Sequence, residues 1–179
     1  AFELLTAKGD FNNWKNYLII ANNIMSKGDI NTIERAKEAV RLFPTNSEIK
    51  SLFNTIAIGQ ENINKAQKLS NLALTNFNQQ DYVQAAANFE KAIALNPYEY
   101  AFYENAATSN YLTGDLNKAL EQIDKVINEM NPLNGKCEYI KALIFIKLGD
   151  PIGACPLLAT SRDSGYGQAE GTFDQYCKN

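Results

Sequence analysis

The side chains that most often carry out chemistry in proteins are sparse in this chain. None of its 179 residues is histidine, which removes the commonest general base, the Ser/His and Cys/His nucleophile pairs and His-based metal sites. Carboxylate pairs do occur, at Glu34 and Glu38 and at Glu121 and Asp124. Their helical spacing among polar residues is typical of a solvated helix face. The sequence therefore predicts a protein that is not an enzyme and that has no cofactor or metal ion.

Three cysteines, Cys137, Cys155 and Cys177, are too widely spaced for a zinc knuckle and have no histidine companions. Cys155 falls near the start of one predicted helix and Cys177 near the end of the next, and antiparallel neighbours bring those ends together. Two states stay open, free thiols or a disulfide that would add about 2–4 kcal/mol and imply an oxidising compartment. Cys137 is predicted to be a small core residue.

The composition excludes several functional classes. A net charge of −3 with scattered Lys and Arg argues against nucleic-acid binding, and no apolar run approaches the ~18 residues of a membrane-spanning helix. The glycines of Gly165-Tyr166-Gly167 follow no strand and precede no Lys-Ser/Thr pair, so they do not predict a phosphate loop. Because the sequence begins at Ala1, a signal peptide or membrane anchor upstream remains open. The expected location is periplasmic or otherwise extracytoplasmic, with the cytoplasm as the alternative.

The elements that position these residues recur along the chain. Residues 66–97 predict a helical hairpin with its turn at Gln80-Asp81. Asp81, Asp115 and Asp150 occupy the same turn in three successive units, separated by 34 and 35 residues. A one-residue insertion, which leaves Asn131 where Pro132 is expected, accounts for the longer spacing. Two positions hold a small residue in every unit, as a close helix crossing requires. The first holds Ala73, Ala107 and Ala142, and the second holds Ala85, Ala119 and Ala154.

The first 65 residues are less regular. Residues 1–13 predict a poorly fixed lead, residues 14–46 a degenerate hairpin, and Asn46 or Ser47 can cap a further helix. We favour continuity of that helix into the next one, over 47–79, against a break near Gly59. The predicted organisation is a degenerate repeat and linking helix (1–65), three repeats (66–99, 100–134 and 135–168) and a capping helix (169–179).

The period and residue types resemble the tetratricopeptide repeat (TPR) family, clearly over residues 66–168 and weakly over 14–46. The family's Gly-Asp-Tyr turn appears as Gln80-Asp81-Tyr82, Gly114-Asp115-Leu116 and Gly149-Asp150-Pro151. The segment from Gly153 onward also looks like the closing hairpin and cap of Bacteroidetes-type and Sel1-like repeat proteins. The resemblance implies an all-α fold, a right-handed superhelix of antiparallel helical hairpins (a TPR-like α-solenoid). Its concave surface would come mainly from the first helix of each repeat and bind a peptide or protein segment.

The repeat register assigns residues to that concave surface. The candidate partner-binding residues are Gln67, Ser70, Leu74, Phe77, Asn78, Glu104, Asn105, Thr108, Tyr111, Leu112, Lys136, Tyr139, Leu143 and Lys147. Asn105 and Lys136 match two positions of the clamp with which some family members capture a C-terminal carboxylate. The other clamp positions hold Ser70, Leu74 and Ile140, which argues against a chaperone-tail receptor.

The apolar residues in this set favour an apolar or amphipathic helix, or an extended peptide with apolar anchors, as the partner. A terminal helix folded back against the same surface is the competing interpretation. The first functional hypothesis is a non-catalytic scaffold of a bacterial envelope complex, with attachment to a membrane by an upstream segment left open. The alternative is the recruiting or regulatory domain of a membrane enzyme such as a glycan polymerase or transferase.

Overall fold

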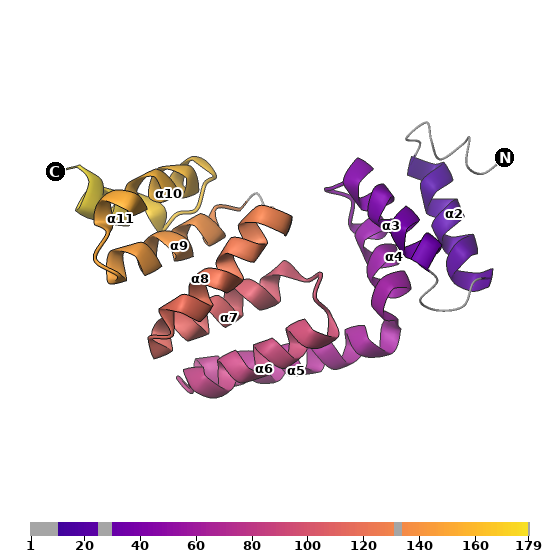
Figure 1. The fold of residues 1–179 in the computed structure, drawn as a ribbon, viewed down its shortest axis with the longest axis horizontal. Coiled ribbons are helices and arrows are strands. Elements are labelled where there is room, and N and C mark those ends of the chain that lie inside the picture. Colours follow the sequence, from indigo (N-terminus) through magenta and orange to yellow (C-terminus); the bar gives the residue numbers. More distant parts are fainter. Residues whose placement is uncertain (1–10, 25–29, 131–133, 179) are drawn as a thin grey trace. The chain divides into compact units, whose positions relative to one another are not determined.

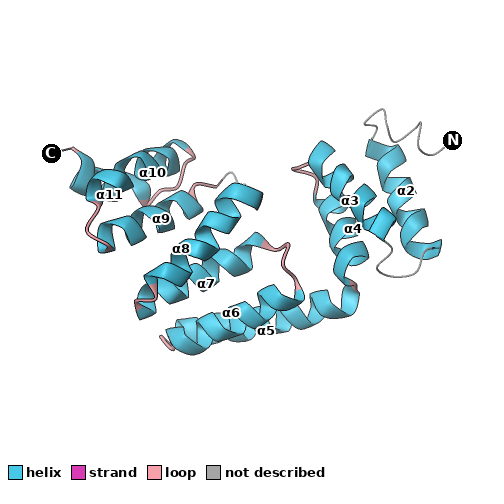
Figure 2. Ribbon diagram, viewed as in Figure 1, coloured by secondary structure: helices cyan, strands magenta, loops and turns pink. Residues whose placement is uncertain are grey.

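The computed structural model describes residues 11–24, 30–130 and 134–178, and within these ranges all of the regular structure is helical (Figure 1). Loops and turns are the only other elements drawn there (Figure 2). The chain divides into two compact units, residues 1–65 and 66–179. None of the described helices is long and apolar enough to cross a membrane. The lead expected at residues 1–13 lies mostly outside the described residues.

The first unit packs three helices around one apolar core. These are α2 (Phe11–Ile24), α3 (Ile30–Leu42) and α4 (Ser47–Ile58), and each contacts the other two. Asn46 begins α4 by accepting a hydrogen bond from the Ile49 backbone N–H at 3.0 Å, as its capping pattern predicts. The core residues are Trp14, Leu18, Ala36, Ala39, Ile49, Phe53 and Ile56. The degenerate hairpin of α2 and α3 therefore shares its core with the helix that follows it, α4.

The preference for one continuous helix over 47–79 is wrong. Helix α4 ends at Ile58, and α5 (Gln60–Asn78) begins after Gly59, whose φ is 77°. A residue with a positive φ cannot continue a right-handed helix, and glycine is the residue that adopts a positive φ without a steric penalty. The single glycine is thus enough to separate the two helices.

The second unit contains the predicted hairpins. After α5 come α6 (Tyr82–Leu95), α7 (Tyr100–Thr113), α8 (Leu116–Lys125), α9 (Lys136–Lys147), α10 (Pro151–Asp163) and α11 (Ala169–Cys177). Each second helix begins at an aspartate, and Asp81, Asp115 and Asp150 accept hydrogen bonds from backbone N–H groups three residues ahead. The preceding residue has a positive φ in every repeat, 90° at Gly114, 88° at Gly149 and 62° at Gln80. The turn geometry therefore holds even where glycine is absent.

The small positions lie where the register places them. All six alanines, Ala73, Ala85, Ala107, Ala119, Ala142 and Ala154, are fully buried. A large apolar residue four positions after the second alanine is also fully buried in each repeat, and it is Phe89, Ile123 or Leu158. Small residues at the crossings and one large residue between them give each hairpin its core.

A pair of amide side chains joins the two helices of the first and second hairpins. In the first, Asn88 donates to Asn76 at 3.0 Å; in the second, Asn110 donates to Gln122 at 2.9 Å, and both side chains are buried. The equivalent residues of the third hairpin are apolar. Phe145 and Leu157 pack there around one small cluster with Ala142 and Ala154. The same pair of repeat positions can therefore hold either two hydrogen-bonded amides or two apolar side chains.

The 35-residue spacing has a local explanation in α8. Its last turn continues as a π-helical segment, η1 (Val126–Met130), in which each hydrogen bond encloses one more residue than in an α-helix. Such a turn absorbs a single extra residue without unwinding the helix. The insertion inferred near Asn131 and Pro132 falls outside the described residues, but the π-helical turn lies directly before it.

The C-terminal helix α11 packs against α10, as α7 packs against α6 and α9 against α8. It therefore takes the place that the first helix of a fourth repeat would occupy. One assigned concave residue, Tyr139, contacts this helix, with 3.2 Å between its hydroxyl and Thr172 Oγ1, so the competing interpretation of a terminal helix against the surface holds at that residue. Apart from Gly171 and Tyr176, the exposed positions of α11, such as Glu170, Asp174 and Gln175, are polar, as expected of a helix that caps an array.

Replacing Ala107 with leucine should destabilise the second unit by about 1–3 kcal/mol, because the larger side chain would separate two helices that cross at a fully buried position. Urea denaturation followed by circular dichroism measures the change. Ala94→Leu, at an exposed position of α6, is the control and should stay within about 0.5 kcal/mol of wild type. Equal stabilities for the two variants would show that the assigned register is wrong.

The amide pair supports a double-mutant test. Gln122→Leu alone should cost about 1–3 kcal/mol, because it leaves the buried Asn110 amide without its partner. Asn110→Leu/Gln122→Leu removes both polar groups, like the Phe145–Leu157 pair of the third hairpin, and should recover much of that loss. A double variant as unstable as the sum of the two single variants would contradict a hydrogen-bonded pair.

Candidate interaction surface

The residues assigned to the concave surface differ in exposure. Five are exposed: Gln67, Leu74, Asn78, Leu112 and Lys147. Seven are half-buried: Phe77, Asn105, Thr108, Tyr111, Lys136, Tyr139 and Leu143. The remaining two, Ser70 and Glu104, are buried. The prediction that Ser70 and Glu104 present their side chains to a partner is therefore wrong. These two residues share one repeat position, 34 residues apart, and at Glu104 that position faces the neighbouring first helix rather than solvent.

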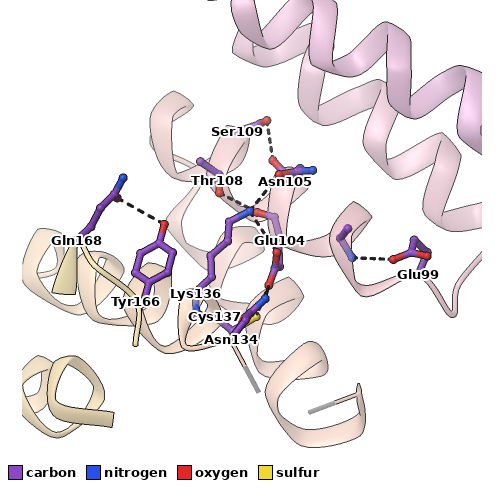
Figure 3. Close-up of polar contacts among 11 residues, drawn as sticks. Glu99, Glu104, Asn105, Thr108, Ser109, Asn134, Lys136, Cys137, Tyr166 and Gln168 are labelled. Carbon is purple, nitrogen blue, oxygen red and sulfur yellow. Dashed lines mark hydrogen bonds and ion pairs between the residues drawn. The ribbon is translucent and has the colours of Figure 1, made fainter. Parts of the chain in front are cut away.

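Glu104 is the polar centre of the contact between α7 and α9. Only 3% of its surface is exposed, and Figure 3 shows its carboxylate among residues at the start of α9. Oε2 pairs with Lys136 Nζ at 3.2 Å, while Oε1 accepts from Asn134 Nδ2 and from Cys137 Sγ, each at 3.2 Å. A buried carboxylate with several donors and a counter-charge is well satisfied. It ties the second repeat to the third.

The same contacts determine what Lys136 and Asn105 can do. Lys136 Nζ reaches both the Glu104 carboxylate and Asn105 Oδ1, the latter at 3.3 Å. The two residues that match a carboxylate clamp therefore contact each other, and an internal carboxylate already neutralises the lysine. Binding an external carboxylate here would require competition with Glu104. This arrangement agrees with the prediction against a chaperone-tail receptor.

Cys137 is fully buried beside Glu104. Burial, followed by the charge of Glu104, raises the pKa of the Cys137 thiol far above its usual range. A thiol that stays protonated is neither a good nucleophile nor a metal ligand. In the described part of the chain, no group of three or more cysteine, aspartate and glutamate residues is arranged to hold a metal ion.

A second contact between α7 and α9 involves Tyr111 and Lys147. The Lys147 ammonium lies 4.6 Å from the centre of the Tyr111 ring and donates to the Tyr111 backbone carbonyl at 2.9 Å. The lysine thus makes a cation–π contact and satisfies a carbonyl in the last turn of α7. Burial, followed by the nearby phenols of Tyr139 and Tyr176, raises the pKa of Tyr111, so tyrosines of α9 and α11 both lie within electrostatic reach of Tyr111.

Tyr139 occupies the same repeat position as Glu104 and also reaches the next helix. Its hydroxyl lies 3.2 Å from Thr172 Oγ1 of α11, and its ring centre lies 5.1 Å from that of Tyr166 in the connection before α11. The contact between α9 and α11 thus repeats the contact between α7 and α9 with different chemistry. Helix α11 covers one side of Tyr139 and extends the row of first helices.

The position of α11 is fixed by a covalent bond and by packing. The structure contains a disulfide between Cys155 of α10 and Cys177 of α11, with 5.7 Å between their Cα atoms. Phe173 packs on the α9–α10 cluster, and its ring centre lies 4.7 Å from the Arg162 guanidinium. Closing the loop of the 22-residue separation restricts the unfolded chain and contributes about 2–4 kcal/mol.

Sequence reasoning missed three residues of this region, Tyr166, Thr172 and Tyr176. Thr172 and Tyr176 were left out because residues 169–179 were assigned only the role of a cap, and Tyr166 because it was assigned to the connection before that helix. The period offered a usable signal, since one further step of 35 residues from α9 leads into α11. A helix in that place continues the surface as well as closing the core.

The comparisons with known proteins support the repeat fold. Residues 66–99 match the model of the tetratricopeptide repeat, and no curated protein sequence matches the chain. Among solved structures, the chain is similar to the Sgt2 TPR domain from Aspergillus fumigatus, with 18% identity over 62% of this chain and 76% of that one and a TM-score of 0.55.

Two further structures resemble more of the chain. The TPR2AB domain of yeast Sti1, solved in complex with pHSP90, has 18% identity over 93% of this chain and 67% of that one, with a TM-score of 0.57. MamA has 19% identity over 94% of this chain and 96% of that one, with a TM-score of 0.53. These likenesses confirm the predicted all-α, TPR-like solenoid class and show the fold alone.

Thiol labelling tests both cysteine environments. In unreduced native protein at pH 8, a maleimide should label no cysteine, because the Cys137 thiol is buried and protonated. Denaturation without a reductant should expose one thiol, Cys137, and reduction should then expose all three. Mass spectrometry counts the labels. Labelling of native Cys137, or three labels without a reductant, would contradict the structure.

Proposed function

We propose that this chain is a non-catalytic scaffold that binds a peptide or protein segment through its first-helix surface. The observation that carries the proposal is the row of half-buried and exposed apolar and aromatic residues along α5, α7 and α9. Leu74 and Leu112 are each 41% exposed at assigned concave positions, and Phe77, Tyr111, Tyr139 and Leu143 are half-buried at others. A segment with apolar anchors suits such a surface better than a polar ligand does.

The polar groups of the surface support a binding role over catalysis. Each polar atom of the Glu104 carboxylate has a structural partner, and the neighbouring Cys137 thiol is held protonated. An active site needs a group that is held in place yet free to react. The titratable residues at the α7–α9 contact serve instead to hold two repeats together.

The disulfide supports a location outside the cytoplasm, and a bacterial envelope complex stays the first hypothesis for where the scaffold acts. Disulfides persist in oxidising compartments and are rare in reducing ones. Envelope attachment through a further segment of the protein, and a role as the recruiting domain of a membrane enzyme, are both compatible with this location. Counting labels on protein alkylated at lysis of its native cells tests the location, since three labelled thiols would indicate a reducing compartment.

Site-specific photo-crosslinking tests the surface directly. A photoreactive amino acid at Leu74 or Leu112 should crosslink the same partner in cells that make the protein, because both residues are exposed on the proposed surface. Val83 and Ile152, which are 63% and 84% exposed just after the hairpin turns, are the controls and should give no crosslink to that partner. Crosslinking from the turns but not from the first helices would contradict the proposed surface.

A further inference from the structure

Four tyrosines and a lysine gather where α7, α9 and α11 meet, and we refer to them as the tyrosine surface: Tyr111, Tyr139, Lys147, Tyr166 and Tyr176. We propose that the tyrosine surface binds an extended, proline-containing segment that carries an acidic side chain. This inference rests on the proposed scaffold function and names the chemistry of the partner at one part of the same surface.

Two sets of contacts within the tyrosine surface each link neighbouring helices. Lys147 of α9 lies against the Tyr111 ring of α7, with 4.6 Å between the ammonium and the ring centre. Tyr139 of α9 contacts the Tyr166 ring at 5.1 Å and Thr172 of α11 at 3.2 Å. Tyr176, also on α11, is close enough to Tyr111 for the two phenols to interact electrostatically. The disulfide at Cys177 holds this end of α11 in place.

The tyrosines offer flat apolar rings together with unused hydroxyl groups. Tyr176 is 39% exposed and Tyr111 is half-buried. Among the described residues, neither of these two hydroxyls has a hydrogen-bond partner, whereas those of Tyr139 and Tyr166 contact Thr172 and Gln168. A tyrosine ring therefore presents an apolar face and a polar tip that a ligand can use at the same time.

A polyproline II segment matches both properties. It has no internal hydrogen bonds, so its backbone carbonyls are free to accept from tyrosine hydroxyls, and its pyrrolidine rings pack on aromatic faces. An amphipathic helix satisfies its own carbonyls and would cover the hydroxyls with apolar side chains, which leaves them without partners. The tyrosine surface therefore favours the proline-containing segment over the helix.

The charge of the partner follows from Lys147. Within the described residues its ammonium has no carboxylate partner, whereas Lys118, Lys136 and Lys141 are each paired with one. Lys147 is exposed and uses one of its three N–H donors on the Tyr111 carbonyl. An acidic side chain on the bound segment would neutralise the charge of the Lys147 ammonium.

Binding of defined peptides to the oxidised protein tests the proposal. The probe is a terminally blocked nonapeptide of Pro-Pro-Glu repeats, and the controls are Ala-Ala-Glu and Pro-Pro-Lys repeats of the same length. Titration followed by NMR should give saturable binding of the Pro-Pro-Glu peptide. Both controls should bind more weakly, because one lacks the pyrrolidine rings and the other reverses the charge.

Conservative variants localise the binding. Tyr176→Phe removes one hydroxyl and should weaken binding roughly 2- to 12-fold, the range expected for one hydrogen bond. Lys147→Met should also weaken it and Lys147→Arg should retain it. The controls Tyr98→Phe, at a tyrosine that is 40% exposed outside the cluster, and Lys68→Met, at an exposed position of α5, should have no effect.

Four results would overturn the proposal. The first three are no saturable binding of the Pro-Pro-Glu peptide, equal binding of all three peptides, and binding unaffected by both Tyr176→Phe and Lys147→Met. The fourth is stronger binding of an amphipathic Leu/Glu helix than of the Pro-Pro-Glu peptide. If crosslinking from Leu112 persisted in any of these cases, the scaffold function would stand and only the partner chemistry would fall.

Discussion

The close approach of helix backbones at the buried alanines is the constraint on which the second unit depends. Ala107 and Ala119 admit no larger side chain where the helices of a hairpin cross and where one hairpin meets the next. Because these positions recur at the repeat period, every hairpin stacks in the same way, and side chains at one repeat position face the same neighbour. The proposed partner-binding surface is a consequence of this packing.

One repeat position shows how the packing assigns roles to side chains. It holds Ser70, Glu104 and Tyr139, three residues of unlike chemistry. Glu104 reaches across to α9 and Tyr139 reaches across to α11, so the position serves the contact between successive first helices. The buried carboxylate has three donors there, and the tyrosine has one hydroxyl partner. The fold therefore fixes where the side chain goes, and its chemistry decides how strongly two repeats are joined.

Much of the fold was predictable because it repeats. The aspartate caps, the left-handed residue before them and the small crossings recur three times, so each occurrence supports the others. The break at Gly59 was missed because it occurs once and rests on one backbone angle. The burial of Ser70 and Glu104 was missed because the helical period gives the face on which a residue lies but not which side chains from other helices cover it. Cys137, which contacts Glu104, comes from the next repeat, and Asn134 comes from the end of the same repeat, 30 residues away in sequence.

The C-terminal helix closes the array and also borders the proposed partner-binding surface. Because α11 stands in the place of a first helix, its polar side faces solvent while Thr172 and Tyr176 face the tyrosines of α7 and α9. A helix of nine residues has little intrinsic stability in water. The disulfide and the packing of Phe173 hold it on α10. The stability of this cap and the integrity of the surface beside it therefore depend on the same few contacts.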